Sequence, residues 1–180
     1  MRVIAGEWRG RKLLAPKNDA TRPTADRTRE TLFSMLTSRL GSFEGLHVAD
    51  LFAGSGALGI EALSRGAANC LFGEQDRDAL DALRKNLDAL GATARADVRA
   101  GSVLALGPAR RACDLLLFDA PYGTGAGSVA LDKLNRLGWV GPDSLISIES
   151  AEKEVVDVAG FAVDAERRVG KAKLTLLRPS

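Results

Sequence analysis

An aspartate, a proline and a tyrosine follow an apolar run in the second half of the chain. Residues 119–122 are Asp-Ala-Pro-Tyr, and they come directly after Leu-Leu-Leu-Phe. Such a run is typical of a buried strand, so Asp119 is expected at a strand's carboxyl end, where ligands bind in open α/β sheets. Pro121 restricts Ala120 to extended geometry, which directs the Ala120 carbonyl and the Asp119 carboxylate outward together. These acceptors could hold the two N–H groups of a planar amine while Tyr122 stacks on its ring. The alternative is an ordinary turn after a strand.

A glycine-rich segment follows the strand expected at 46–51. Gly54, Gly56 and Gly59 match the dinucleotide-binding pattern G-x-G-x-x-G, and Glu74 follows twenty residues after the first of them. Glycines let a ligand approach the backbone without meeting a Cβ atom, and the acid can accept hydrogen bonds from two ribose hydroxyls. Taken alone, the pattern predicts a nicotinamide cofactor, and a role in packing only is the alternative.

Asp50, four residues before the first glycine, favours a different cofactor. A carboxylate repels a pyrophosphate but attracts a ligand with an ammonium and a sulfonium group, and S-adenosylmethionine carries both. We expect its ribose at Glu74, its amino group at Asp50 or the Gly54–Gly56 backbone, and its carboxylate at a helix near the amino terminus. The candidate cofactor-binding residues are Arg22, Thr24, Arg27, Asp50, Phe52, Ala53, Gly54, Ser55, Gly56, Glu74, Gln75, Ser102, Val103 and Asp119.

The charge of the chain is uneven. The net charge is +2 over 180 residues, but residues 1–40 carry nine lysines and arginines against four acids, which leaves −3 for the remainder. A basic amino-terminal segment indicates a polyanion docking surface, because phosphate contacts supply most of the sequence-independent affinity for nucleic acids. A solvated face with an incidental positive excess is the alternative. The candidate RNA-binding residues are Arg2, Trp8, Arg9, Arg11, Lys12 and Arg22.

The hydrophobic pattern predicts one α/β domain, residues 41–180, behind an extension, residues 1–40. In the extension we expect a β-hairpin with strands at 2–6 and 11–14, and a helix that Thr24 caps and that runs to about Leu40. Strands and helices then alternate, which is typical of a doubly wound, mostly parallel sheet. We expect strands near 46–51, 69–74, 95–100, 113–118 and 143–149, helices near 57–65, 76–90 (capped by Asp76) and 127–138, and two antiparallel strands between 161 and 177.

Composition and spacing argue against several classes of protein. No apolar run approaches the ~20 residues that span a bilayer, and Glu7 and Arg9 come too early for a signal peptide, so we expect a cytoplasmic protein. Cys70 and Cys113 are 43 residues apart, and His47 is the one histidine. Because this is not the spacing of metal ligands, we expect buried, reduced thiols, no metal site and a local packing or hydrogen-bonding role for the histidine.

Four segments of the chain resemble the bacterial 16S ribosomal RNA guanine-N2 methyltransferase family. They are residues 2–13 (RVIAGEWRGRKL), 22–33 (RPTADRTRETLF), 50–67 (DLFAGSGALGIEALSRGA) and 119–122 (DAPY). The first two are the most specific, because generic methyltransferases lack them. The resemblance implies a class I fold with strand order 3-2-1-4-5-7-6, an antiparallel seventh strand and S-adenosylmethionine as donor. It also implies that the substrate is a guanine of small-subunit rRNA, presented by an assembling ribosomal particle. We expect a monomeric enzyme.

Two positions depart from the family's pattern. Ala120 stands where the family has a proline. Because Pro121 still restricts residue 120, we expect the alanine to lower the free energy of unfolding by only about 0.4–1 kcal/mol, through a larger entropy of the unfolded chain. The backbone carbonyl that the amine needs is still present. Ser102 stands where an acid is frequent, at the place where the adenine edge would lie. Asp119, Ala120, Pro121 and Tyr122 are the candidate catalytic residues.

Three alternatives remain open at this stage. The first is a methyltransferase that acts on DNA adenine N6 or on a protein glutamine amide, because the same geometry of residues 119–122, the clamp, serves all of these amines. A non-catalytic RNA-binding module that kept the fold is the second, although intact Asp50, Glu74 and Asp119 argue against it. A nicotinamide oxidoreductase is the third, and the charge of Asp50 argues against it.

Overall fold

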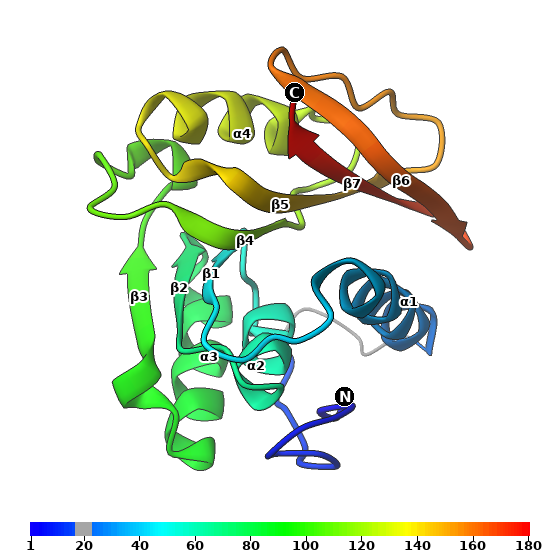
Figure 1. Cartoon of the computed structure of the whole chain (residues 1–180). Helices are drawn as coiled ribbons and strands as arrows, with labels where there is room; N and C mark the ends of the chain where they lie inside the picture. Colours follow the sequence, from blue (N-terminus) through cyan, green and yellow to red (C-terminus); the bar gives the residue numbers. More distant parts are fainter. Residues whose placement is uncertain (17–22) are drawn as a thin grey trace.

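The computed structural model describes residues 1–16 and 23–180, and its centre is a seven-stranded sheet. The strands are β1 (His47–Leu51), β2 (Asn69–Glu74), β3 (Ala96–Ala100), β4 (Cys113–Phe118), β5 (Val140–Ala151), β6 (Phe161–Val169) and β7 (Ala172–Pro179). They lie in the order β3-β2-β1-β4-β5-β7-β6, and β7 runs antiparallel to both of its neighbours (Figure 1). This order confirms the doubly wound, class I fold that the family resemblance implies.

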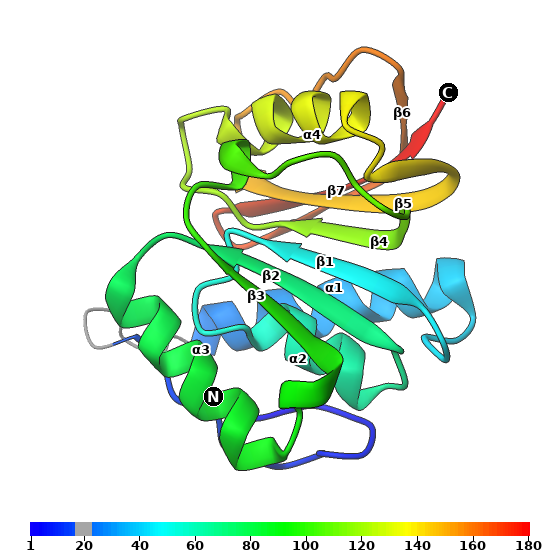
Figure 2. The same ribbon diagram turned by 90° about the vertical axis from the view of Figure 1, so that its left-hand side faces the viewer.

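Helices cover both faces of the sheet. Within the described ranges they are α1 (Pro23–Leu40), α2 (Ala57–Ser64), α3 (Arg77–Leu90) and α4 (Ala126–Arg136), with short 3₁₀ turns at Thr93–Arg95 and Val103–Ala105. Figure 2 shows α1, α2 and α3 on one face and α4 on the other. Each face has its own apolar core, the first including Phe33 and Leu83 and the second Leu131 and Trp139. None of these helices is long and apolar enough to cross a membrane.

The predicted elements agree closely with the observed ones, and β2 and β4 have the predicted bounds. The strand expected at 143–149 is longer, because β5 begins at Val140. The predicted start of the first helix is wrong. The helix begins at Pro23, so Thr24 lies inside it, and proline fits there because the first helical N–H groups have no partner within the helix. Arg22 lies outside the described residues.

The predicted amino-terminal hairpin is shorter than expected: one antiparallel bridge joins Arg2 and Lys12, and backbone hydrogen bonds run from Val3 to Arg11 and from Leu13 to Met1. The N–H groups of Ile4 and Ala5 donate instead to the Glu61 carboxylate of α2, at 2.8 and 3.1 Å. Because a side chain takes these donors, they are not available to a partner strand. The antiparallel pairing of the predicted hairpin is therefore present, but the predicted strand bounds 2–6 and 11–14 are too long, and residues 4–8 form a loop held against α2.

Candidate active site

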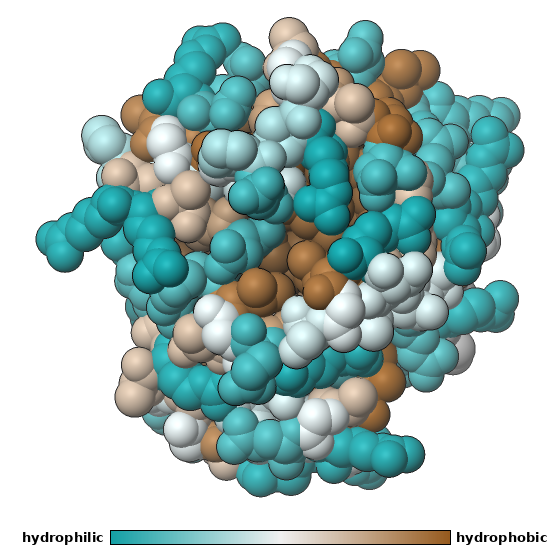
Figure 3. Space-filling view, in the orientation of Figure 1, coloured by the Kyte–Doolittle hydropathy of each residue, from teal (hydrophilic) through white to brown (hydrophobic). Residues whose placement is uncertain are grey.

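A cavity of about 940 Å³ lies at the carboxyl ends of β1, β2, β4 and β5, the edge at which open α/β sheets bind ligands. The start of α1, the turn between β6 and β7, and Met1, Ala15 and Pro16 of the amino-terminal segment also line it. On the face seen in Figure 3, apolar surface is visible in a central hollow with hydrophilic side chains around it. The predicted site residues that line the cavity are Asp50, Phe52, Ala53, Gly54, Ser55, Glu74, Gln75, Ser102, Val103, Asp119, Ala120, Pro121 and Tyr122.

The glycine-rich loop turns sharply between β1 and α2. Phe52 has a φ of 62°, a left-handed geometry that is strained in a residue with a side chain and is frequent at functional sites. A Cβ atom added at Gly54 would meet nothing within 4 Å, whereas at Gly56 and Gly59 it would lie 2.3 and 2.4 Å from side chains of the core. Gly56 and Gly59 therefore serve packing, and Gly54 is the glycine that leaves room for a ligand.

Asp50 is a buried carboxylate at the cavity, only 1% exposed. Its Oδ2 accepts a hydrogen bond of 2.9 Å from the Gly59 N–H and so caps the first turn of α2. Oδ1 has no partner among the described residues. Burial, together with the nearby Asp119 and Glu74, raises the pKa of Asp50 well above the usual carboxyl range, while the bond from Gly59 lowers it. A buried acceptor of this kind fits a cationic ligand group.

The Glu74 carboxylate accepts hydrogen bonds from backbone N–H groups of the glycine-rich loop and of the two residues that follow Glu74. Its Oε1 accepts the Gly54 N–H at 2.8 Å, and its Oε2 accepts the N–H groups of Gln75 and Asp76 at 2.9 and 2.8 Å. Each carboxylate oxygen has two lone pairs, so both on Oε2 are used and one on Oε1 remains for a hydroxyl group of a ligand. As predicted, Asp76 caps α3, through a bond of 2.9 Å from the Ala79 N–H.

Ser102 has a local role as well as a place in the cavity lining. Its Oγ accepts the Leu104 N–H at 3.2 Å and caps the 3₁₀ turn Val103–Ala105. Because a hydroxyl has two lone pairs and one donor, capacity remains for a ligand. The expected contact with an adenine edge stays a prediction.

The residues after β4 lie in the same cavity. Asp119 is exposed at the strand end, and Ala120 beside it is buried. Tyr122 is 46% exposed, and its hydroxyl donates a hydrogen bond to the carboxylate of Glu149 in β5. Partial burial and this bond raise the pKa of Tyr122, so the hydroxyl stays protonated. Glu149 also lines the cavity and was not among the predicted residues, although it closes the predicted strand 143–149 just as Asp119 follows the strand 113–118.

Arg29, rather than the predicted Arg27, reaches the cavity from α1. Arg27 is exposed, whereas Arg29 is 5% exposed and donates from Nη2 to the Arg2 carbonyl at 2.6 Å. Its Nη1 has no partner among the described residues, and Asp26 lies 3.5 Å from Nη2. Burial lowers the pKa of Arg29. The helical spacing of Arg29 from Leu32 and the rest of the apolar stripe was a signal that could have found it.

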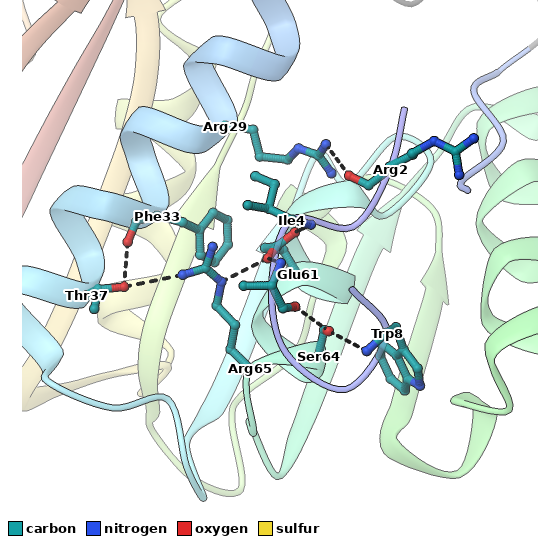
Figure 4. Close-up of polar contacts among 10 residues, drawn as sticks. Arg2, Ile4, Trp8, Arg29, Phe33, Thr37, Glu61, Ser64 and Arg65 are labelled. Carbon is teal, nitrogen blue, oxygen red and sulfur yellow. Dashed lines mark hydrogen bonds and ion pairs between the residues drawn. The ribbon is translucent and has the colours of Figure 1, made fainter. Parts of the chain in front are cut away.

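The amino-terminal segment is fastened to α2 by buried polar groups (Figure 4). The Glu61 carboxylate, which accepts the Ile4 and Ala5 N–H groups, also pairs with Arg65 at 2.9 Å. The Trp8 N–H donates to the Ser64 hydroxyl at 3.0 Å, and that hydroxyl donates to the Ala5 carbonyl. The Trp8 ring is buried in the core, which argues against its predicted RNA contact. The other described residues of that set are exposed, namely Arg2, Arg9, Arg11 and Lys12.

The cysteines and the histidine have the roles expected from their spacing. Cys70 and Cys113 are free and buried, and burial raises the pKa of Cys113 to about 12. His47 Nδ1 lies 2.8 Å from the side-chain nitrogen of Asn69, a local contact at the start of β1. In the part of the chain that the structure describes, no three side chains of the metal-binding types converge.

Comparison with known proteins agrees with this geometry. A family model described as Conserved hypothetical protein 95 matches residues 1–178. Ribosomal RNA small subunit methyltransferase D of Escherichia coli is 39% identical over 150 residues, which cover 83% of this chain and 74% of that protein. Its namesake in Haemophilus influenzae is 35% identical, and the match covers 94% of this chain and 89% of that protein.

The fold agrees with a solved structure as well. The structure of yhhF from Escherichia coli superposes with a TM-score of 0.85 at 36% identity, and the match covers 100% of this chain and 98% of that one. The family model, the two relatives and this structure all include the glycine loop, its acids and the clamp after β4 within the matched range. The chain therefore belongs to the Conserved hypothetical protein 95 family, and it is an S-adenosylmethionine-dependent methyltransferase similar to ribosomal RNA small subunit methyltransferase D.

Proposed function

We propose that the protein transfers a methyl group from S-adenosylmethionine to the exocyclic N2 amine of a guanine in 16S ribosomal RNA. The observation that carries the proposal is that one cavity is lined both by Asp50, Gly54 and Glu74 and by residues 119–122. The first group suits the cofactor, and the second suits a planar amine. Relatives named for methylation of small-subunit ribosomal RNA support the substrate class.

The polar groups of the cavity suit the cofactor's own charges. Asp50 Oδ1 would take the ammonium, Arg29 Nη1 the carboxylate and Glu74 Oε1 a ribose hydroxyl, and the first two atoms have no partner among the described residues. The open space at Gly54 lets the ligand approach the loop backbone. The bound cofactor supplies a methyl group activated on a sulfonium. Contacts from Arg22 and Thr24 stay predictions.

The clamp addresses the weakness of the nucleophile. The lone pair of an aryl amine is delocalised into its ring, so the nitrogen attacks poorly. Acceptance of its two N–H groups by the Asp119 carboxylate and the Ala120 carbonyl would favour a tetrahedral nitrogen, and the carboxylate would face the positive charge that develops there. Tyr122 would stack on the extruded base. The methylated nitrogen then loses its proton to Asp119 or to water.

We propose residues 1–40 as the RNA-docking and cofactor-capping extension. Arg2, Arg9, Arg11 and Lys12 would contact phosphates, and Trp8 would hold the loop in place from the core. The segment extends from Met1, which lines the cavity, to the carboxyl-terminal ends of α2 and α3, where it is bonded at Ser64 and Ala89 at the opposite edge of the sheet. A strand of five residues spans about 17 Å, so the RNA would extend along the molecule by at least that length. This separation suits a structured RNA in an assembling particle that is bound by one protomer of the enzyme.

The test is mass mapping of methylated nucleotides in 16S ribosomal RNA from cells with and without the gene. We expect the loss of one N2-methylguanine, and its return with the wild-type gene but not with an Asp119→Ala variant. Loss of a methyl group from an adenine, or an unchanged set of methylated nucleotides, would contradict the proposal. Methylation of DNA adenine or of a protein amide by the purified enzyme would favour the other amine substrates.

A further inference from the structure

Glu149 lies beside Asp119 at the carboxyl edge of the sheet. Strands β4 and β5 are parallel neighbours, and Phe118 pairs with Ile148, so Asp119 and Glu149 are the next residues on adjacent strands. Neighbouring strands lie about 4.8 Å apart, and both side chains line the cavity. The pair therefore presents two carboxyl groups side by side to any ligand held at the end of β4.

The hydrogen bond from Tyr122 fixes the position of Glu149. The tyrosine hydroxyl donates to Oε2, and among the described residues no hydrogen bond reaches Oε1, which stays available to a ligand. The same bond joins the carboxyl group to the ring that would stack on the base. Glu149 is therefore held near the edge of a base stacked on Tyr122.

The ring atom next to the amine distinguishes guanine from the other amine substrates. In guanine, N2 has N1–H, a hydrogen-bond donor, as a neighbour on the ring. In adenine and cytosine the corresponding neighbours of the amine are N1 and N3, which are acceptors, and in a glutamine amide it is the carbonyl oxygen. A carboxylate beside the clamp can bond to the first and repels the lone pairs of the others.

We propose that Glu149 is the specificity-determining residue of this site and accepts the N1–H of the target guanine. The proposal rests on the proposed function and adds the means by which the base is chosen. Asp119 and the Ala120 carbonyl take the two N2 hydrogens, and Glu149 Oε1 takes the N1 hydrogen. All three donors on that edge of guanine then have acceptors, whereas adenine would place a lone pair against the carboxylate.

The first test needs only the wild-type protein. A ligated 16S ribosomal RNA carries either guanine or 2-aminopurine at the mapped position, and it is used both free and assembled with small-subunit proteins. 2-Aminopurine keeps the 2-amine but has no N1–H. We expect single-turnover methyl transfer to guanine to be faster by about 10- to 100-fold, the value of one hydrogen bond to a charged group. Equal rates would overturn the proposal for Glu149. Transfer to neither base would instead contradict the proposed function.

The second test uses Glu149→Gln, whose amide can accept from guanine N1–H or donate to the N1 of 2-aminopurine. We expect the preference for guanine to fall to within about threefold, with binding of S-adenosylmethionine unchanged in a calorimetric titration. Glu152→Gln is the matched control, because Glu152 is three residues further on and does not line the cavity. It should keep the wild-type preference. An unchanged preference in Glu149→Gln would show that the residue does not select the base.

Discussion

Two carboxylates of the cavity differ in their surroundings, and this difference separates their roles. Asp50 is 1% exposed and bonded to the first turn of α2, whereas Asp119 is exposed at the end of β4. A buried, fixed acceptor suits a resident ligand. An exposed one suits a group that arrives and leaves, as a target base must.

Replacement of Asp119 by asparagine is expected to slow methyl transfer by about 100- to 1,000-fold, because a neutral amide cannot stabilise the charge that develops on the amine nitrogen. Single-turnover transfer measures this, and a calorimetric titration with S-adenosylmethionine should show unchanged affinity. Asp132→Asn, a change on the surface of α4, is the control and should leave the rate unchanged. A rate within about threefold of wild type for Asp119→Asn would contradict the clamp.

At the scale of elements, α2 is the part to which the amino-terminal segment and the glycine loop both attach. Asp50 caps its first turn, and Glu61 and Ser64 hold residues 4–8 near its end. Helix capping and side-chain bonds to a loop are local, directional contacts. The position of Met1 at the cavity therefore depends on a helix that contributes no charged group of its own to the cavity.

Glu61→Ala is expected to lower the free energy of unfolding by about 3–5 kcal/mol, because it leaves two part-buried N–H groups without acceptors and Arg65 without its buried partner. Urea unfolding measures the change. Asp132→Ala is the matched control, since Asp132 and Arg136 form a pair of the same i, i+4 spacing on the surface. It should change stability by less than about 1 kcal/mol. Equal effects of the two changes would contradict the role of Glu61 as an anchor.

The sequence predicts the elements well where hydrophobic periodicity determines them, and poorly where a side chain competes for the backbone. Strands β2 and β4 have the predicted bounds because their apolar runs are bounded by turn residues. The hairpin is shorter than predicted because Glu61, more than fifty residues away, accepts the N–H groups of Ile4 and Ala5. Asp50, Glu74 and Asp119 could be found because they lie at or just after the carboxyl ends of strands, and the same rule would have found Glu149. The prediction of Arg29 as a site residue would have required knowing which face of α1 lines the cavity.

At the scale of the whole molecule, the amino-terminal segment extends from the cavity, at Met1, to the opposite edge of the sheet, where Arg11 bonds to Ala89 near the end of α3. If the amino-terminal loop contacts RNA phosphates, Arg9→Ala and Lys12→Ala should each weaken RNA binding and reduce the slope of log affinity against log salt by about 1. Binding of S-adenosylmethionine should not change. Arg136→Ala, on α4 at the other face of the sheet, is the control. An unchanged salt dependence in both loop variants would place the RNA elsewhere.

The buried acids of the cavity should also make the stability of the whole protein depend on pH. Burial raises the pKa of Asp50 and of Glu149, so above about pH 4 the folded protein holds protons that the unfolded chain releases. The free energy of unfolding contributed by these groups is then greatest at low pH and falls as the pH rises toward the raised values. Asp50→Asn removes one of the two groups, so its unfolding free energy should fall less between about pH 5 and about pH 8. S-adenosylmethionine, whose ammonium would pair with ionised Asp50, should stabilise wild type more at the higher pH and this variant less. Urea unfolding with and without the cofactor measures both effects, and parallel pH curves for the two proteins would contradict the assignment of Asp50 to the ammonium.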